Sequence, residues 1–238
     1  MAVARTYTTR DPAFLARVLV PSLCVYAATA AVNIVAGAIQ VGSLAQMPPG
    51  APMSLAESTV GGPFNEILYT VSNLGVLAAF LLAGFLTLKW IYRSSRNAHA
   101  IEQAVARRGS SDPSFRRDMS VSPPWAVGWF FVPIAILWKP FEALRETWQV
   151  STDPVAWTFV LIPNLLRWWW GLWLLENILG NVALRLSLSF GTVEGQLLSD
   201  LAQMAQHTVA VAATLALILI VQRLTGLQVA AINAQRFD

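Results

Sequence analysis

Three long stretches of the chain have no charged side chain, and this feature constrains the fold more than any other. They are Val18 to Val41, Ile67 to Leu88 and Leu201 to Gln222. Each is long enough to cross a membrane, because about 20 apolar residues in a helix span a hydrocarbon core roughly 30 Å thick. A mean hydropathy of +0.53 and a charged fraction of 12% exclude an ordinary soluble domain. The sequence therefore predicts an all-α polytopic membrane protein.

A fourth stretch, at residues 165–188, is apolar overall but contains Arg167, Glu176 and Arg185. Charged side chains at such positions need protein partners or must reach the lipid headgroups. We predict that this stretch is also a membrane span. The four predicted spans, at residues 18–41, 67–88, 165–188 and 201–222, form a single membrane domain that covers residues 1–238.

The distribution of Lys and Arg predicts which side of the membrane each loop faces. Neither residue occurs at 42–65 or 189–200, whereas residues 89–118 contain one Lys and six Arg. Positive residues favour the cytoplasmic side of a membrane. Four crossings then place both termini in the cytoplasm, together with a linker at residues 94–122.

The segment Trp125 to Trp138 is apolar, but it has only 14 residues and contains Pro133. This length is too short for a full crossing, and proline interrupts a helix. A fifth crossing would also place the Lys- and Arg-free loop at 189–200 in the cytoplasm. We therefore predict a re-entrant or interfacial segment.

A short amphipathic helix is predicted directly after this segment, at residues 141–149. Apolar Phe141, Leu144 and Trp148 follow at helical spacing, and polar residues occupy the other side. Indole rings favour the headgroup level of a membrane. We predict that this surface helix and the segment before it form a cytoplasmic platform for lipid. The candidate platform residues are Trp125, Trp129, Trp138, Glu142, Arg145 and Trp148.

Four runs of sequence resemble a bacterial membrane family that is catalogued as domain of unknown function 4328. They are YRSSRN (92–97), SPPWAVGWFFVP (122–133), LWKPFEALRETW (137–148) and RWWWGLWLLENILG (167–180). The resemblance extends over roughly residues 65 to 225. It implies a bacterial inner membrane and the same plan of several helices, and it implies no activity or catalytic residue.

Glu176 lies near the middle of its predicted span and is the most unusual residue within the membrane. Arg167 and Arg185 are each nine residues away, on the opposite side of the helix, so neither can pair with it. Such an acid is costly unless it is paired or protonated. Asparagines at similar depth complete a candidate polar layer, which consists of Asn33, Asn73, Glu176, Asn177 and Asn181. This layer either joins the helices by hydrogen bonds or forms a ligand or proton site.

A second group of polar residues lies near the predicted outer end of the last span. Asp200, Gln203 and His207 share one face of that helix, and Arg185 ends the preceding span on the same side. These residue types suit acid–base chemistry, but a single histidine is more often structural. Cys24 is the only cysteine, and the sequence has no phosphate-binding or hydrolase motif. We therefore predict no catalytic residue, metal or cofactor.

The sequence favours a non-enzymatic bundle that binds membrane lipids, another membrane protein or a second copy of itself through the cytoplasmic platform. The alternative is a transporter or enzyme for a lipidic or small polar substrate, using Glu176 and the asparagine layer. A net charge of +3 fits the cationic loops, so no nucleic acid partner is predicted. The two functions differ in whether Glu176 lines a cavity or is sealed by apolar packing.

Overall fold

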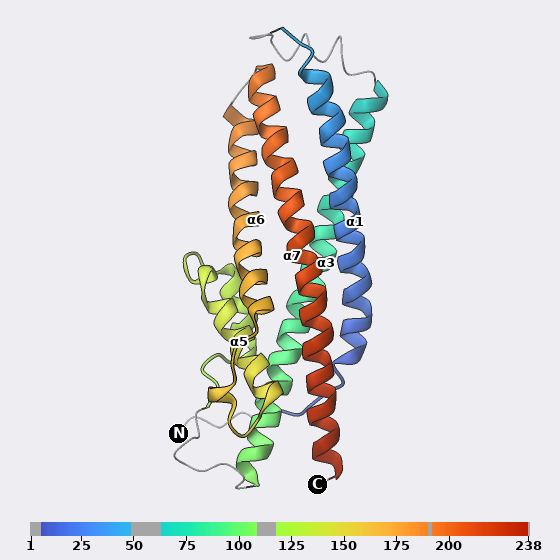
Figure 1. Cartoon of the computed structure of the whole chain (residues 1–238). Coiled ribbons are helices and arrows are strands. Elements are labelled where there is room, and N and C mark those ends of the chain that lie inside the picture. The colour runs from blue at the N-terminus through green and yellow to red at the C-terminus, as the bar shows by residue number, and fades with distance from the viewer. Residues whose placement is uncertain (1–5, 49–62, 109–117, 190–191, 238) are drawn as a thin grey trace. The chain divides into compact units, whose positions relative to one another are not determined.

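The computed structural model of the chain describes residues 6–48, 63–108, 118–189 and 192–237, and this part is helical without a β-strand (Figure 1). The five longest helices are α1 (Ala13–Leu44), α3 (Pro63–Arg107), α5 (Lys139–Thr152), α6 (Asn164–Ser189) and α7 (Val193–Phe237). Short helical turns lie between α3 and α6: α4 (Pro123–Gly128), η1 (Trp129–Phe131), η2 (Ala135–Leu137) and η3 (Trp157–Phe159). The predicted all-α class is confirmed.

Three helices are long and apolar enough to cross a membrane. They are α1, the part of α3 from Thr70 to Arg107 and the part of α7 from Val193 to Ala234. The complete helices α1, α3 and α7 each contain one of the uncharged stretches described above. Helix α3 continues well beyond Leu88, because its next residues are good helix formers without Pro or Gly.

Helix α6 matches the predicted fourth span at residues 165–188 within one residue at each end. Its 26 residues would extend about 39 Å, which is enough for a crossing. Nevertheless α6 is not among the three helices above. Its tryptophans, asparagines and charged residues make it less apolar than the other long helices. That α6 crosses the membrane therefore remains a proposal.

The tryptophan-rich segment is bent, as its proline led us to expect. Residues 123–131 and 135–152 form two helical pieces that meet at 114°, so they make either one broken span or a re-entrant loop. Counting them as one span would give four membrane-crossing helices. The backbone turns at Pro133 and at Ile134, which has a φ of 67°.

The chain divides into two compact units. Unit 1 contains residues 1–21, 84–167 and 217–238, and unit 2 contains residues 22–83 and 168–216. Unit 2 thus holds α1 from Ser22 to its end, the first half of α3, most of α6 and the first half of α7. Unit 1 holds the tryptophan-rich segment, α5 and the remaining parts of these helices.

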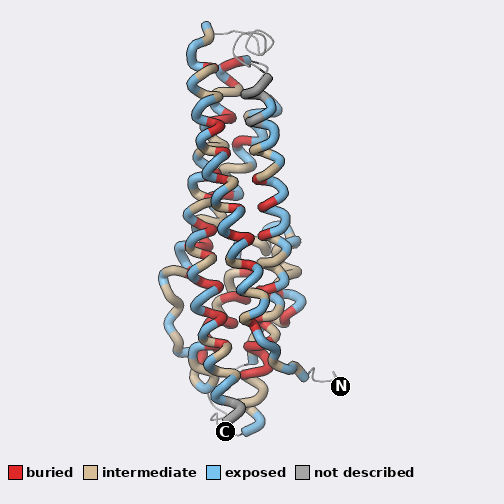
Figure 2. The backbone as a smooth tube through the Cα atoms, turned by 90° about the vertical axis from the view of Figure 1, so that its right-hand side faces the viewer, coloured by how far each residue is buried: buried red, intermediate tan, exposed pale blue. Residues whose placement is uncertain are grey.

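The long apolar helices leave much of their surface uncovered by protein. Within the most apolar 18-residue windows of α1, α3 and α7, only 33%, 17% and 44% of residues are buried. Pale blue, exposed residues accordingly follow these helices over much of their length (Figure 2). An apolar surface of this extent is expected to contact lipid rather than water.

Helix α5 is not the surface helix that we predicted. Nine of its 14 residues are buried, including Glu146 and Gln149 on the side expected to face water. Residues 120–121 cover Glu146, and the chain around Val160 covers Gln149. The prediction was wrong because helical periodicity does not reveal that distant segments cover the polar face.

Candidate functional site

Glu176 of α6 is bound to Tyr26 of α1 within unit 2. The Tyr26 hydroxyl donates a hydrogen bond of 2.8 Å to Oε1 of Glu176, and both residues are less than 10% exposed. The ring of Tyr26 also packs against that of Phe80, with the two centroids 5.8 Å apart. Sequence reasoning missed Tyr26, because a tyrosine in an apolar run carries no pattern that distinguishes it from a packing residue.

Asn33 and Asn73 form a separate polar contact between α1 and α3. The Asn33 amide donates to Oδ1 of Asn73 at 2.9 Å and to Oγ of Ser72 at 3.3 Å. Asn33 is 2% exposed, so this pair joins two helices inside unit 2. The predicted layer therefore contains two distinct groups of contacts, one around Asn33 and one around Glu176.

A groove of about 210 Å³ lies beside Glu176 in unit 2. We refer to it as the Glu176 groove. Its polar lining comes from α6 and α7 and its aromatic lining from α3 and α6. The lining residues are Phe80, Trp173, Glu176, Asn177, Gly180, Asn181, Leu184 and Gln206. Glu176 therefore lines a groove and is not sealed on every side by apolar packing, which on this criterion favours the alternative of a transporter or enzyme.

Gly180 allows Gln206 of α7 to lie close against α6. A Cβ atom at position 180 would stand 3.2 Å from Nε2 and 3.3 Å from Cδ of Gln206. Any larger side chain at this position would therefore displace the Gln206 amide or occupy the groove.

The predicted outer cluster does not form an acid–base pair through its histidine. Asp200 is 1% exposed and accepts a 2.7 Å hydrogen bond from Gln196, while Gln203 donates to Ser199 at 3.4 Å. His207 is buried, and its Nδ1 has no hydrogen-bond partner among the described residues. Arg185, the fourth candidate, is exposed on α6. Among the residues that the structure describes, no group of His, Cys, Asp and Glu could hold a metal ion.

The tryptophan-rich segment exposes large apolar side chains in unit 1. Trp125 and Trp138 are about half exposed, and the rings of Trp125 and Trp129 lie 4.5 Å apart. Phe131 and Ile134, at the bend, are each 72% exposed. We refer to residues 125–138 as the apolar bend.

The platform residue Trp148 belongs to the interior instead. It is 8% exposed, because α5 is covered on both of its sides. Trp148 therefore cannot contact lipid as part of the predicted platform.

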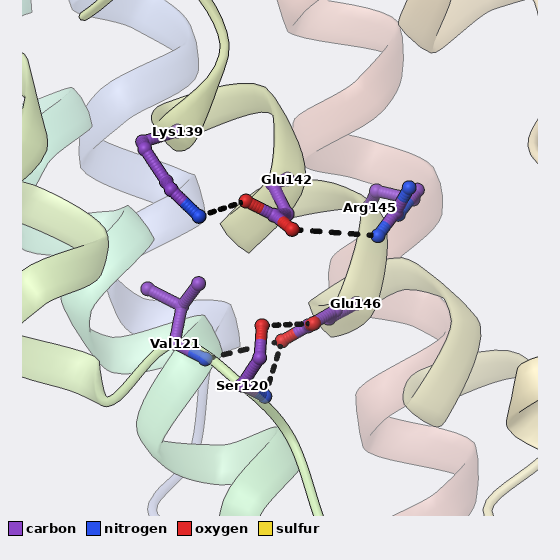
Figure 3. A network of polar contacts seen from close by, with 6 residues as sticks. All are labelled: Ser120, Val121, Lys139, Glu142, Arg145 and Glu146. Atoms are coloured by element: carbon purple, nitrogen blue, oxygen red, sulfur yellow. Dashed lines mark hydrogen bonds and ion pairs between the residues drawn. The ribbon is translucent and has the colours of Figure 1, made fainter. Parts of the chain in front are cut away.

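Glu146 connects α5 to the residues that precede the apolar bend (Figure 3). Its carboxylate accepts hydrogen bonds from the Ser120 amide at 2.9 Å, the Val121 amide at 3.3 Å and the Ser120 hydroxyl. Glu146 is only 4% exposed. These bonds satisfy two backbone donors just before α4 and fix the start of the bend. We refer to this set as the Glu146 clamp.

The charged residues of α5 form two ion pairs that share Glu142. Glu142 accepts a 2.6 Å hydrogen bond from Lys139, while the nearest nitrogen of Arg145 is 3.9 Å from its other oxygen (Figure 3). Because all three side chains are about one-third exposed, these pairs are expected to contribute little to stability.

Unit 1 also contains a buried polar network that the sequence did not reveal. The Asn97 amide donates to the Arg10 carbonyl at 2.9 Å and to Gln228 Oε1 at 3.2 Å. Gln228 in turn donates to the Ser94 carbonyl at 2.8 Å and to the Ser151 hydroxyl at 3.2 Å. The network thus joins the residues before α1 with α3, α5 and α7.

His99 lies near this network, on α3 beyond the uncharged stretch that ends at Leu88. Its Nδ1 is 2.9 Å from Sδ of Met119, and its ring meets that of Tyr7 edge to face. The buried imidazole is part of the packing of unit 1.

Comparison with known proteins identifies a family but no activity. The model of a family described as "Domain of unknown function (DUF4328)" matches residues 61–226, which confirms the resemblance seen in the four sequence runs. No curated protein and no solved structure matches the chain.

Proposed function

Because the chain belongs to the DUF4328 family, whose description assigns no activity, we propose a function from the geometry of its described residues. The protein is a non-enzymatic integral membrane protein of the bacterial inner membrane. Its apolar bend enters the cytoplasmic leaflet and binds lipid there.

The backbone at Ile134 is the observation that carries this proposal. Its φ of 67°, its ψ of −54° and the hydrogen bond from the Ala135 amide to the Pro133 carbonyl define a strained γ-turn, which costs about 1–3 kcal/mol for a β-branched residue. A soluble turn would gain stability from glycine at this position. Here the residue is an isoleucine that is 72% exposed. An apolar side chain kept at the tip of a bend despite this strain is explained by contact with lipid.

The arrangement of the whole bend supports the same function. Five large apolar residues between positions 125 and 138 are at least 48% exposed: Trp125, Phe131, Ile134, Leu137 and Trp138. The Glu146 clamp and Lys139 place polar groups at the two ends of this apolar stretch. Apolar side chains between polar anchors are typical of segments that lie in the membrane interface.

The distribution of Lys and Arg supports the proposal that the apolar bend lies on the cytoplasmic side of the membrane. With α1, α3, α6 and α7 as four crossings, both termini and the positively charged residues 89–118 face the cytoplasm. The apolar bend follows directly and would enter the membrane from that side.

The insertion of Ile134 can be measured with an environment-sensitive fluorophore. We would attach nitrobenzoxadiazole to an Ile134→Cys variant, in a Cys24→Ser background, and place the protein in lipid nanodiscs. Doxyl groups on the acyl chains should quench the fluorophore strongly, because position 134 lies among them. Quenching that is stronger with doxyl near the headgroup than near the chain end would indicate an interfacial bend, and the reverse would indicate a re-entrant one.

Thr152, which is exposed and polar at the end of α5, provides the matched control position. The fluorophore at Thr152→Cys should be quenched by iodide in the water and only weakly by doxyl lipid. If position 134 behaved like position 152, the bend would face water and the proposed lipid binding would be wrong.

A second candidate function is favoured by the Glu176 groove. The groove brings a buried acid together with Asn177, Asn181 and Gln206, as a transporter or enzyme for a small polar or lipidic substrate requires. Polar side chains that face lipid without a hydrogen-bond partner cost free energy. A bound polar ligand would supply partners and remove this cost.

A further inference from the structure

The donors and acceptors of the Glu176 groove restrict which ligand it suits. The Asn177 amide donates to the Trp173 carbonyl at 2.7 Å, and the Asn181 amide donates to the Asn177 carbonyl at 2.9 Å. Each asparagine thus uses one N–H group within α6 and keeps its second N–H group and its side-chain oxygen. Together with the Glu176 carboxyl, the α6 side of the groove therefore offers both hydrogen-bond acceptors and donors.

The charge of the residues that line the groove disfavours an anionic ligand and favours a cationic one. The lining residues include one acid and no Lys, Arg or His. An anion would therefore meet a carboxyl group without any positive partner. A cation, in contrast, would balance an ionised Glu176 that is otherwise costly within a membrane.

The aromatic residues of the groove suit a cation as well. Phe80 and Trp173 both line it. The faces of such rings attract ammonium groups. A neutral polyol would be held less well, because it has no charge to balance Glu176 and gains less from the faces of the rings.

We propose that the Glu176 groove binds the ammonium group of an amine ligand, with Glu176 as its counter-ion. The ammonium group comes either from a free organic amine or from the headgroup of an aminophospholipid, since both present the same chemistry. The inference deepens the second candidate function and rests on ligand binding in the groove, not on transport.

The first arm of the test uses benzylammonium as the probe and benzyl alcohol as its neutral counterpart. Both are titrated by calorimetry into the full chain in maltoside micelles, which contain no ammonium group, and empty micelles are subtracted. We expect benzylammonium to bind at least tenfold more tightly than benzyl alcohol. Glu176→Gln should remove at least tenfold of the benzylammonium affinity, because the amide has no charge.

Two further variants test the place of binding without removing the acid. Gly180→Leu should abolish binding, because its side chain would meet Gln206 and occupy the groove. Gln206→Leu should weaken binding severalfold, whereas the matched Gln203→Leu, outside the groove on the same helix, should not. These variants keep the test decisive if Glu176→Gln fails to fold.

The second arm distinguishes the two sources of the ammonium group. Native mass spectrometry would compare retention of phosphatidylethanolamine and phosphatidylglycerol with identical acyl chains. Selective retention of phosphatidylethanolamine that Gly180→Leu abolishes would identify the headgroup as the source. Binding of benzylammonium without this selectivity would identify a free amine.

Three results would overturn the inference: neither probe binds, benzyl alcohol binds as tightly as benzylammonium, or Gly180→Leu leaves binding intact. Amine binding without movement of benzylammonium across the membrane of reconstituted vesicles would refute only the transporter function. Insertion of the apolar bend is measured separately, so failure of one proposal does not affect the other.

Discussion

Replacing Glu146 by leucine is expected to lower the free energy of unfolding by about 2 kcal/mol, the largest effect of any single substitution that we predict. The change leaves the buried Val121 amide without its acceptor, together with the amide and the hydroxyl of Ser120, which is exposed. An unsatisfied buried donor costs about 1–3 kcal/mol, whereas water can replace the acceptor of the two Ser120 donors at a smaller cost. Reversible unfolding in mixed detergent micelles would measure the change.

Two control variants distinguish the loss of the Glu146 clamp from the loss of a negative charge on α5. Glu146→Gln should cost clearly less, because its oxygen can still accept from the two amides while its NH₂ donates to a reoriented Ser120 hydroxyl. Glu142→Leu, on the same helix but about one-third exposed, should cost less than about 1 kcal/mol. Equal losses for Glu146→Leu and Glu142→Leu would show that the clamp does not stabilise unit 1.

Replacing Glu176 by leucine should lower stability by about 1–3 kcal/mol, because the buried Tyr26 hydroxyl then has no acceptor. Hydrogen bonds between membrane helices often stabilise by less, about 1 kcal/mol, so the lower half of this range is expected. Glu176→Gln should be nearly neutral, because the amide oxygen still accepts from Tyr26. The same unfolding assay compares both variants with the wild type.

A double-mutant cycle tests whether the two residues act as a pair. Tyr26→Phe combined with Glu176→Leu should cost less than the sum of the single changes, since both remove the same bond. Asn181→Leu is the matched control on α6, because its amide bonds only to its own helix, and it should have little effect. Strictly additive losses at Tyr26 and Glu176 would contradict the pairing.

The uncharged stretches predicted the main helices well, because a membrane span depends on local composition. Helix α1, for example, contains the whole of 18–41, and the extension of α3 toward Arg107 follows from its helix-forming residues. Pro133 likewise predicted the break in the apolar bend. Such features can be predicted without knowing which helices are neighbours.

The contacts between segments could not be predicted in the same way. The periodicity of residues 141–149 placed Glu146 on a solvated face, yet residues far from it in sequence cover that face. The bond from Tyr26 to Glu176 joins residues 150 positions apart. A pattern within one helix indicates which side is apolar but not which segment packs against it. The partners of Glu146 and Glu176 were therefore missed, although the predicted layer did contain the bonded pair Asn33 and Asn73.

The membrane topology is tested most directly by cysteine labelling of intact cells with an impermeant maleimide. In a Cys24→Ser background, single cysteines would replace Ser54, Val155 and Thr192. Ser54 lies outside the described residues, whereas Val155 lies between α5 and α6 and Thr192 between α6 and α7, both exposed. These three positions distinguish a crossing by α6 from a crossing by the bent segment at residues 123–152.

Four crossings by α1, α3, α6 and α7 predict that Ser54→Cys and Thr192→Cys are labelled in intact cells, while Val155→Cys reacts only after permeabilisation. Labelling of Val155→Cys from outside would mean that the bent segment crosses the membrane completely. That result, or protection of Thr192→Cys, would contradict both the four-crossing topology and the cytoplasmic, lipid-binding bend that depends on it.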